Sequence, residues 1–122
     1  MRDDREHSVR AWLLYVEQMW NAGDLRGCLD CLHPDLVVQR RQRSFRYPHL
    51  ARWLRSCFSL NADSQIRLVI ERIELQTDTA RVMLHIHCRC IRSMQLEERH
   101  LRATLKLISN RTNTWLVREI EV

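Results

Sequence analysis

The hydrophobic period of the sequence changes at about residue 65, and this change constrains the fold more than any other feature. Before it, apolar residues recur every three or four positions, which is typical of amphipathic helices. Residues 65–122 are instead rich in β-branched residues and alternate between apolar and polar positions, which is typical of strands. We therefore predict an α+β fold in which N-terminal helices pack on one face of an antiparallel sheet. The length of 122 residues predicts a single domain, 1–122.

The first half of the sequence predicts three helices. Their apolar stripes fall in residues 9–20, 25–32 and 50–58. Gly23 favours the left-handed conformation that ends a helix, and Asp24 is placed to cap the second one. A short strand at residues 36–38 separates the second helix from the third.

Alternation in residues 80–92 sorts side chains between the two faces of the sheet. Val82 and Leu84 point to the core, while His85 and His87 point outward. A two-residue loop at Met94-Gln95 sets Cys88 opposite Leu101, Ile86 opposite Ala103, His87 opposite Arg102 and His85 opposite Thr104. The predicted outer row is His87, Arg102 and Glu121, and it is either solvated or meets a second subunit.

The last strand carries two residues that need an explanation. If Leu116 and Ile120 face inward, Trp115 lies on the outer face, where an exposed indole indicates an interface. Arg118 then turns toward the core, where an unpaired guanidinium is costly. Arg118 therefore lines a cavity, or a β-bulge turns it outward.

Composition excludes several classes of protein. No run of about 18 apolar residues could span a membrane, and the first residues lack the apolar core of a signal peptide, so we expect a cytoplasmic protein. The net charge is +5, but acidic residues are interspersed and no basic block carries interleaved aromatics. We therefore expect neither a membrane nor a nucleic-acid partner.

The cysteines and histidines raise the question of a metal site. Cys28-x-x-Cys31 and Cys88-x-Cys90 supply four thiols, but this spacing is a weak zinc signal and free buried thiols explain it better. The outward histidines, with His100, are either acid–base groups or cross-strand surface pairs. We predict no metal and no cofactor.

Three features together indicate a family. The order of the elements, the segment Asn21-Ala22-Gly23-Asp24-Leu25 and the segment His33-Pro34-Asp35-Leu36-Val37-Val38 resemble the NTF2-like superfamily, which includes SnoaL-like and ketosteroid-isomerase-like proteins. The resemblance implies a cystatin-like cone in which three N-terminal helices pack on a curved antiparallel sheet. It also implies a pocket between sheet and helices, and a homodimer formed through the outer sheet face.

The resemblance assigns candidate residues to these two regions. The pocket residues are Tyr15, Met19, Trp53 and Arg118, and the interface residues are His85, His87, Arg102 and Trp115. Tryptophans at helical spacing are also typical of plain core.

The family's catalytic residues do not carry over to this sequence. Arg40 stands where ketosteroid-isomerase-like members have a catalytic Asp, and Val16 stands where they have a Tyr. The first hypothesis is therefore a homodimer that binds a small apolar ligand without a catalytic acid. The alternative is a SnoaL-like or ketosteroid-isomerase-like isomerase, cyclase or dehydratase acting on a hydrophobic enolisable substrate.

Overall fold

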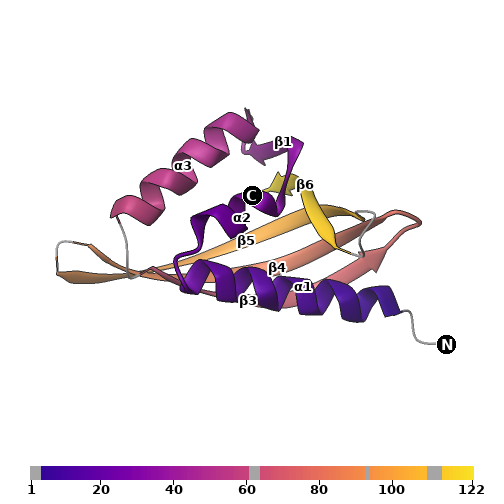
Figure 1. The fold of residues 1–122 in the computed structure, drawn as a ribbon, viewed down its shortest axis with the longest axis horizontal. Coiled ribbons are helices and arrows are strands. Elements are labelled where there is room, and N and C mark those ends of the chain that lie inside the picture. The colour runs from indigo at the N-terminus through magenta and orange to yellow at the C-terminus, as the bar shows by residue number, and fades with distance from the viewer. Residues whose placement is uncertain (1–3, 61–63, 93, 110–113) are drawn as a thin grey trace.

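The computed structural model describes residues 4–60, 64–92, 94–109 and 114–122, which form helices on a six-stranded sheet (Figure 1). The helices are α1 (Asp4–Asn21), α2 (Leu25–Asp30) and α3 (Tyr47–Leu60). The strands are β1 (Leu32–Arg40), β2 (Arg43–Arg46), β3 (Gln65–Leu75), β4 (Thr79–Arg92), β5 (Gln95–Ser109) and β6 (Trp115–Glu121). The predicted α+β class and the three predicted helices are confirmed. Within the described residues, no helix combines the length and apolarity that a membrane span requires.

The strand order in the sheet is β2-β1-β6-β5-β4-β3. Strands β3 to β6 form the predicted antiparallel meander, while β1 runs parallel to β6. Figure 1 shows α1 running along the long strands of a curved sheet, with α3 beside β1. Strand β1 is longer than the predicted residues 36–38 because it gains hydrogen-bonded partners on both sides, β6 and β2.

Side chains of α1 are bonded to the backbone of the edge strand β3. Asn21 Oδ1 accepts from the backbone N–H of Ile66 at 2.7 Å, and Asn21 Nδ2 donates to the carbonyl of Ile66 at 3.0 Å. Glu17 Oε2 accepts from the backbone N–H of Leu68 at 2.8 Å. These bonds occupy groups that an edge strand would otherwise offer to another chain.

The junction between α1 and α2 follows the predicted chemistry. Gly23 has a φ of 74°, and the N–H of Asp24 donates to the carbonyl of Met19 at 2.9 Å, which is the bond of a Schellman motif. Asp24 Oδ1 then accepts from the N–H of Gly27 at 2.9 Å and caps α2. Both predictions at this junction are confirmed.

The alternation in β4 sorts side chains as predicted. Val82 and Leu84 are buried, at 0% and 1% exposure, and belong to the same core as Val9 and Leu13 of α1. The outward residues of β4 lie on the opposite face, with no helix packed over them among the described elements. The inner face of the sheet therefore receives α1, as the period of the sequence predicts.

The predicted register of β4 with β5 is wrong by two residues. The structure pairs Arg92 with Gln95, so the loop is at residues 93–94, and Met94 has the positive φ of 63° that such a turn requires. His87 consequently lies opposite His100, and His85 lies opposite Arg102. A shift of two residues changes every partner and leaves every face unchanged, because side chains alternate with a period of two.

The last strand contains a β-bulge at Arg118. Lys106 pairs with Glu119 while the next residue of β5, Leu107, pairs with Val117, so Arg118 has no partner in the ladder. This is one of the two explanations that the sequence allowed for Arg118.

The bulge reverses the faces of the residues before it. Trp115 is buried at 4% exposure, and its Nε1 donates to Ser8 Oγ of α1 at 3.1 Å. The prediction that Trp115 lies on the outer face is therefore wrong, and so is the inward placement of Leu116, whose pairing with Ile108 puts it on the outer face. Ile120, beyond the bulge, faces the core as predicted.

Candidate functional site

Hydrophobic side chains fill the space between α1 and the sheet. The buried members of this core are Val9, Trp12, Leu13, Leu36, Ala80, Val82, Leu84, Ala103, Leu107, Trp115 and Val117. No polar or charged residue is buried among the residues that the structure describes. This interior therefore offers no described side chain that could transfer a proton to a substrate.

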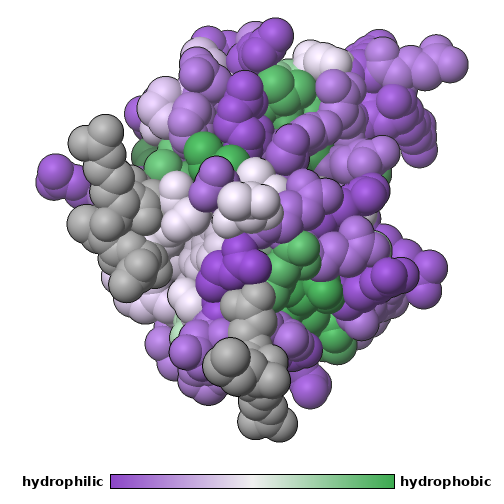
Figure 2. All heavy atoms as spheres, turned by 90° about the vertical axis from the view of Figure 1, so that its right-hand side faces the viewer, coloured by the Kyte–Doolittle hydropathy of each residue, from purple (hydrophilic) through white to green (hydrophobic). Residues whose placement is uncertain are grey.

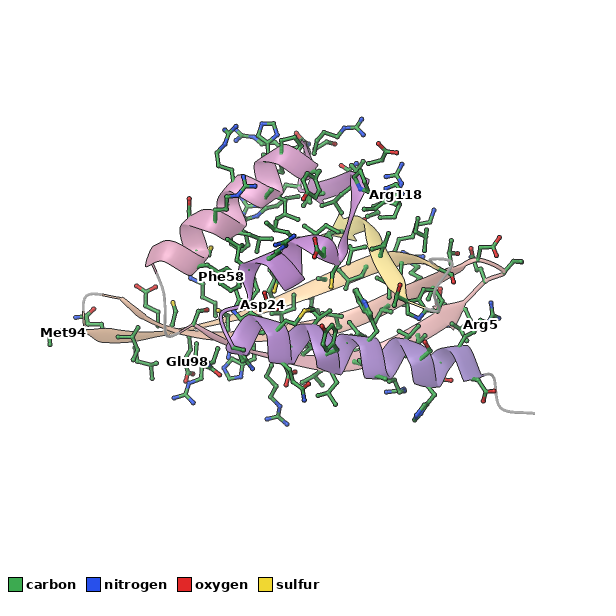
Figure 3. The ribbon with its side chains drawn as sticks, viewed as in Figure 1. Arg5, Asp24, Phe58, Met94, Glu98 and Arg118 are labelled. Carbon is green, nitrogen blue, oxygen red and sulfur yellow. The ribbon has the colours of Figure 1, made fainter. Side chains whose placement is uncertain are left out.

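The structure does not bring the four predicted pocket residues together. Tyr15 on α1 and Trp53 on α3 are 56% and 57% exposed, whereas Met19 is buried. Arg118, on β6, donates to the backbone carbonyl of Asp35 and lies beside β1, away from α1 (Figure 3). The guanidinium thus fastens the irregular start of β1 to β6.

The polar groups of the enzyme alternative are also dispersed. Arg40 is exposed at the end of β1, at the position where the resemblance places a catalytic Asp. Tyr15 on α1 is exposed to solvent, so its hydroxyl is not a buried hydrogen-bond donor. The described residues do not assemble an acid–base pair in the fold's interior, so the geometry does not favour the enzyme alternative.

A cleft of about 500 Å³ opens where α2, β1, α3 and β6 meet. The residues that line it are Leu29, Asp30, Leu32, Pro34, Tyr47 and Leu116. All but Asp30 present apolar surface, and Tyr47 also carries a hydroxyl. Sequence reasoning missed this cleft, because it depends on β1 lying parallel to β6 and on the bulge that turns Leu116 outward.

The outer face of the sheet carries a network of charged and ionisable side chains. Glu71 Oε1 lies 3.4 Å from Arg102 Nε and 3.7 Å from His85 Nδ1. Glu98 lies at the other end of this network. It projects from the β4–β5 hairpin on the side away from α3 (Figure 3). Of the four predicted interface residues, His85, His87 and Arg102 lie on this face.

Three histidines lie side by side on this outer face. The rings of His87 and His100 are stacked, with centroids 4.1 Å apart and planes 20° apart. The ring of His85 meets that of His100 edge-on at 6.2 Å. The stack follows from the observed register, which places His87 opposite His100, and the sequence-based register separated these two residues.

A second hollow of about 250 Å³ lies elsewhere on the outer face. Its lining residues are Gln76, Thr79, Arg81, Thr104, Lys106, Glu119 and Glu121. Two cations and two carboxylates share this small space, so neither sign of charge dominates. Figure 2, an end view of the molecule, shows a largely hydrophilic surface on which apolar side chains form separate patches.

None of the described cysteines forms a disulfide. Burial, together with the neighbouring thiol and Asp24, raises the pKa of Cys28 to about 11. Burial also raises the pKa of Cys31 to about 11, with Asp30 and Asp24 adding to the effect. Both groups therefore stay protonated at neutral pH, which makes them poor nucleophiles.

Comparison with known proteins identifies the fold. No protein-family model and no curated protein matches the sequence. A conserved protein from Planctomyces limnophilus DSM 3776 superposes with a TM-score of 0.79 at 14% identity, over 95% of both chains. An NTF-2 like protein of unknown function from Shewanella oneidensis MR-1 superposes with a TM-score of 0.77 at 14% identity, over 95% of this chain and 96% of that one. The chain has the NTF2-like fold.

A third solved structure superposes on the chain equally well. A ketosteroid isomerase-like protein from Erwinia carotovora atroseptica SCRI1043 superposes with a TM-score of 0.77 at 13% identity, over 99% of this chain and 95% of that one. At such identities the likeness concerns the fold alone. The resemblance that the sequence indicated is thus confirmed at the level of the NTF2-like fold, and function has to be argued from the site.

Proposed function

We propose that this NTF2-like chain is a binding domain without catalytic activity, which takes a small apolar ligand in the cleft between α2, β1, α3 and β6. The cleft carries the proposal, because its volume of about 500 Å³ lies within the usual range of small-molecule sites and most of its lining residues are apolar. The interior beneath α1 is packed with apolar side chains. Of the two hollows described above, the cleft has the larger volume.

The lining of the cleft also suggests the chemistry of the ligand. Leu29, Leu32 and Leu116 supply aliphatic surface, and the ring of Tyr47 supplies a flat one. Asp30 adds a carboxylate, which accepts hydrogen bonds or pairs with a cation. The proposed ligand is therefore a compact apolar molecule that carries one hydroxyl or amino donor and no anionic group.

The second part of the proposal is a homodimer formed through the outer face of the sheet. Val69 is 46% exposed there, on a face that carries carboxylates on β3 and β5 and cations on β4 and β5. In a twofold dimer the same patch meets itself, so a face that carries both signs of charge is self-complementary. Glu71 and Arg102, already 3.4 Å apart, are the groups we expect to exchange partners across the interface.

Ligand binding is tested with the neutral fluorophore N-phenyl-1-naphthylamine, whose emission rises in an apolar site. We expect saturable binding with one fluorophore per chain. Leu116→Trp fills the cleft and should abolish the signal, while Leu14→Trp, on the exposed side of α1, should leave it unchanged. Equal binding by the two variants would show that the fluorophore occupies another site and would refute the proposal.

Dimerisation is tested by light scattering. We expect a mass of twice the 14.8 kDa of one chain. Val69→Glu should return the mass to that of a single chain, and Leu14→Glu serves as the control because Leu14 is as exposed but lies on α1. A wild-type monomer at high concentration would end this part of the proposal and leave the ligand cleft untouched.

A further inference from the structure

We propose that His87, Glu98 and His100 form a binding site for a divalent metal ion such as Zn²⁺ on the outer face of the sheet. One ligand atom of each residue lies within 4.8 Å of the other two. All three ligands come from one chain, so a single copy can supply the site without a second subunit and without a ligand in the cleft.

The backbone explains why the three side chains converge. His87 of β4 lies directly opposite His100 of β5, and side chains in such cross-strand pairs are neighbours on one face. Glu98 precedes His100 by two residues on the same strand, so it projects from the same face. Two paired strands hold the backbone of the three ligand residues in a fixed arrangement.

His87 provides the second observation. Its Nε2 is buried and has no hydrogen-bond partner among the described residues. An unsatisfied buried polar atom destabilises the folded state, and a bound cation would remove this penalty. Glu98 Oε2 is 3.9 Å from His87 Nε2, which is too long for a hydrogen bond.

That distance is longer than the separation of two ligand atoms on one zinc ion. With ligand bonds of about 2.0–2.1 Å, two ligand atoms at the tetrahedral angle lie about 3.3 Å apart. His87 Nε2 and Glu98 Oε2, 3.9 Å apart, would therefore approach each other by about 0.6 Å on binding. A rotation of the exposed His100 ring out of its stack with His87 would complete the set of three.

Neighbouring charges support the carboxylate as a ligand. Arg89 Nε lies 3.4 Å from Glu98 Oε1, so it fixes one oxygen and leaves Oε2 facing His87. Groups that orient a metal ligand in this way commonly strengthen the site. Arg102, the other nearby cation, is paired with Glu71, which reduces its repulsion of a metal ion.

The donor set selects the class of metal. Two imidazoles and one carboxylate suit Zn²⁺, Co²⁺ and Ni²⁺ better than Mg²⁺ or Ca²⁺, which prefer oxygen ligands. Three protein ligands leave at least one coordination position for water.

The test is a titration with Co²⁺ followed by visible absorption, with Zn²⁺ as competitor. We expect one Co²⁺ per chain, displaced by Zn²⁺, with a spectrum that lacks thiolate charge-transfer bands. His100→Asn and Glu98→Gln should each weaken binding by about tenfold or more. His85→Asn is the matched control, because His85 lies on the same face and strand as His87 but is paired with Glu71; its affinity should stay within about twofold of wild type.

Three results would overturn the proposal. They are no binding at all, equal loss in the control and ligand variants, or thiolate bands that assign the metal to the cysteines. Thermal unfolding without metal confirms that each variant is folded, which is expected since Glu98 and His100 are exposed. Saturating Zn²⁺ should also raise the melting temperature of the wild type more than that of His100→Asn, since the stabilisation by a ligand grows with its affinity for the folded state.

Discussion

Two adjacent leucines of α1 provide a sharp test of how this helix docks on the sheet. Leu13 is 1% exposed and belongs to the central core, whereas Leu14 is 55% exposed. Leu13→Ala removes three buried carbons, and at about 0.8 kcal/mol for each this costs about 2.4 kcal/mol of transfer free energy. The cavity left behind adds to this loss, so we expect Leu13→Ala to lower the free energy of unfolding by about 3–4 kcal/mol.

Leu14→Ala should cost far less. About half of its surface already faces water, no cavity forms, and alanine favours the helix slightly, so we expect a loss below about 1 kcal/mol.

The assay for this pair is urea unfolding followed by circular dichroism. With a slope of about 2 kcal/mol per molar, the midpoint should fall by about 1.5 M or more for Leu13→Ala and by less than about 0.5 M for Leu14→Ala. Equal losses, or a larger loss for Leu14→Ala, would mean that α1 docks through a different side and would refute the packing described above.

Two further predictions concern α2 and its thiols. Asp24→Ala should lower the free energy of unfolding by about 1 kcal/mol, measured by thermal unfolding, because Asp24 Oδ1 caps α2 through the N–H of Gly27. Asp24→Asn should keep most of the stability that the cap provides, because an amide oxygen also accepts this hydrogen bond. Equal losses in the two variants would argue against the cap. Burial raises the pKa of Cys28 and Cys31 to about 11. Unfolded thiols ionise near their ordinary pKa of about 8.5, whereas the two folded thiols stay protonated up to about pH 11. Their contribution to the free energy of unfolding is therefore fully present below about pH 8.5 and is lost as the pH rises toward 11. The double variant Cys28→Ala/Cys31→Ala should unfold with a flatter dependence on pH between 9 and about 11, and an unchanged slope would contradict the burial of these thiols.

The sequence predicts the faces of the sheet better than its pairing. The alternation through Val82 and Leu84 assigns the core face without ambiguity, because a slip of one residue would expose every apolar side chain. A slip of two residues moves none of them to the other face. The choice between loops at 93–94 and 94–95 therefore had little signal in the sequence, and the difference decides whether His87 meets His100 or Arg102.

The bulge in β6 accounts for most of the remaining error. One extra residue at Arg118 reverses Trp115 and Leu116, so a residue predicted to lie at an interface is buried against α1 and a predicted core residue lines the cleft. The charge of Arg118 inside an apolar alternation was the available signal, since a buried cation needs an explanation. The parallel contact of β1 with β6 joins segments far apart in the sequence, and no local pattern marks it.

The inner positions of α1 were predictable and the candidate sites were not. Helical period alone places Val9 and Leu13 in the core. Glu98 was missed as a neighbour of His87 because the predicted register placed it beyond the reach of that residue. The candidate metal site is thus a consequence of the register rather than of any sequence motif.

The most direct test of this account is the cross-strand pairing of β4 with β5, measured by nuclear Overhauser effects in isotope-labelled protein. We expect contacts between the backbone protons of His87 and His100, and between those of His85 and Arg102. Contacts of His87 with Arg102 in their place would contradict the register, and with it the stacked histidines and the proposed metal site.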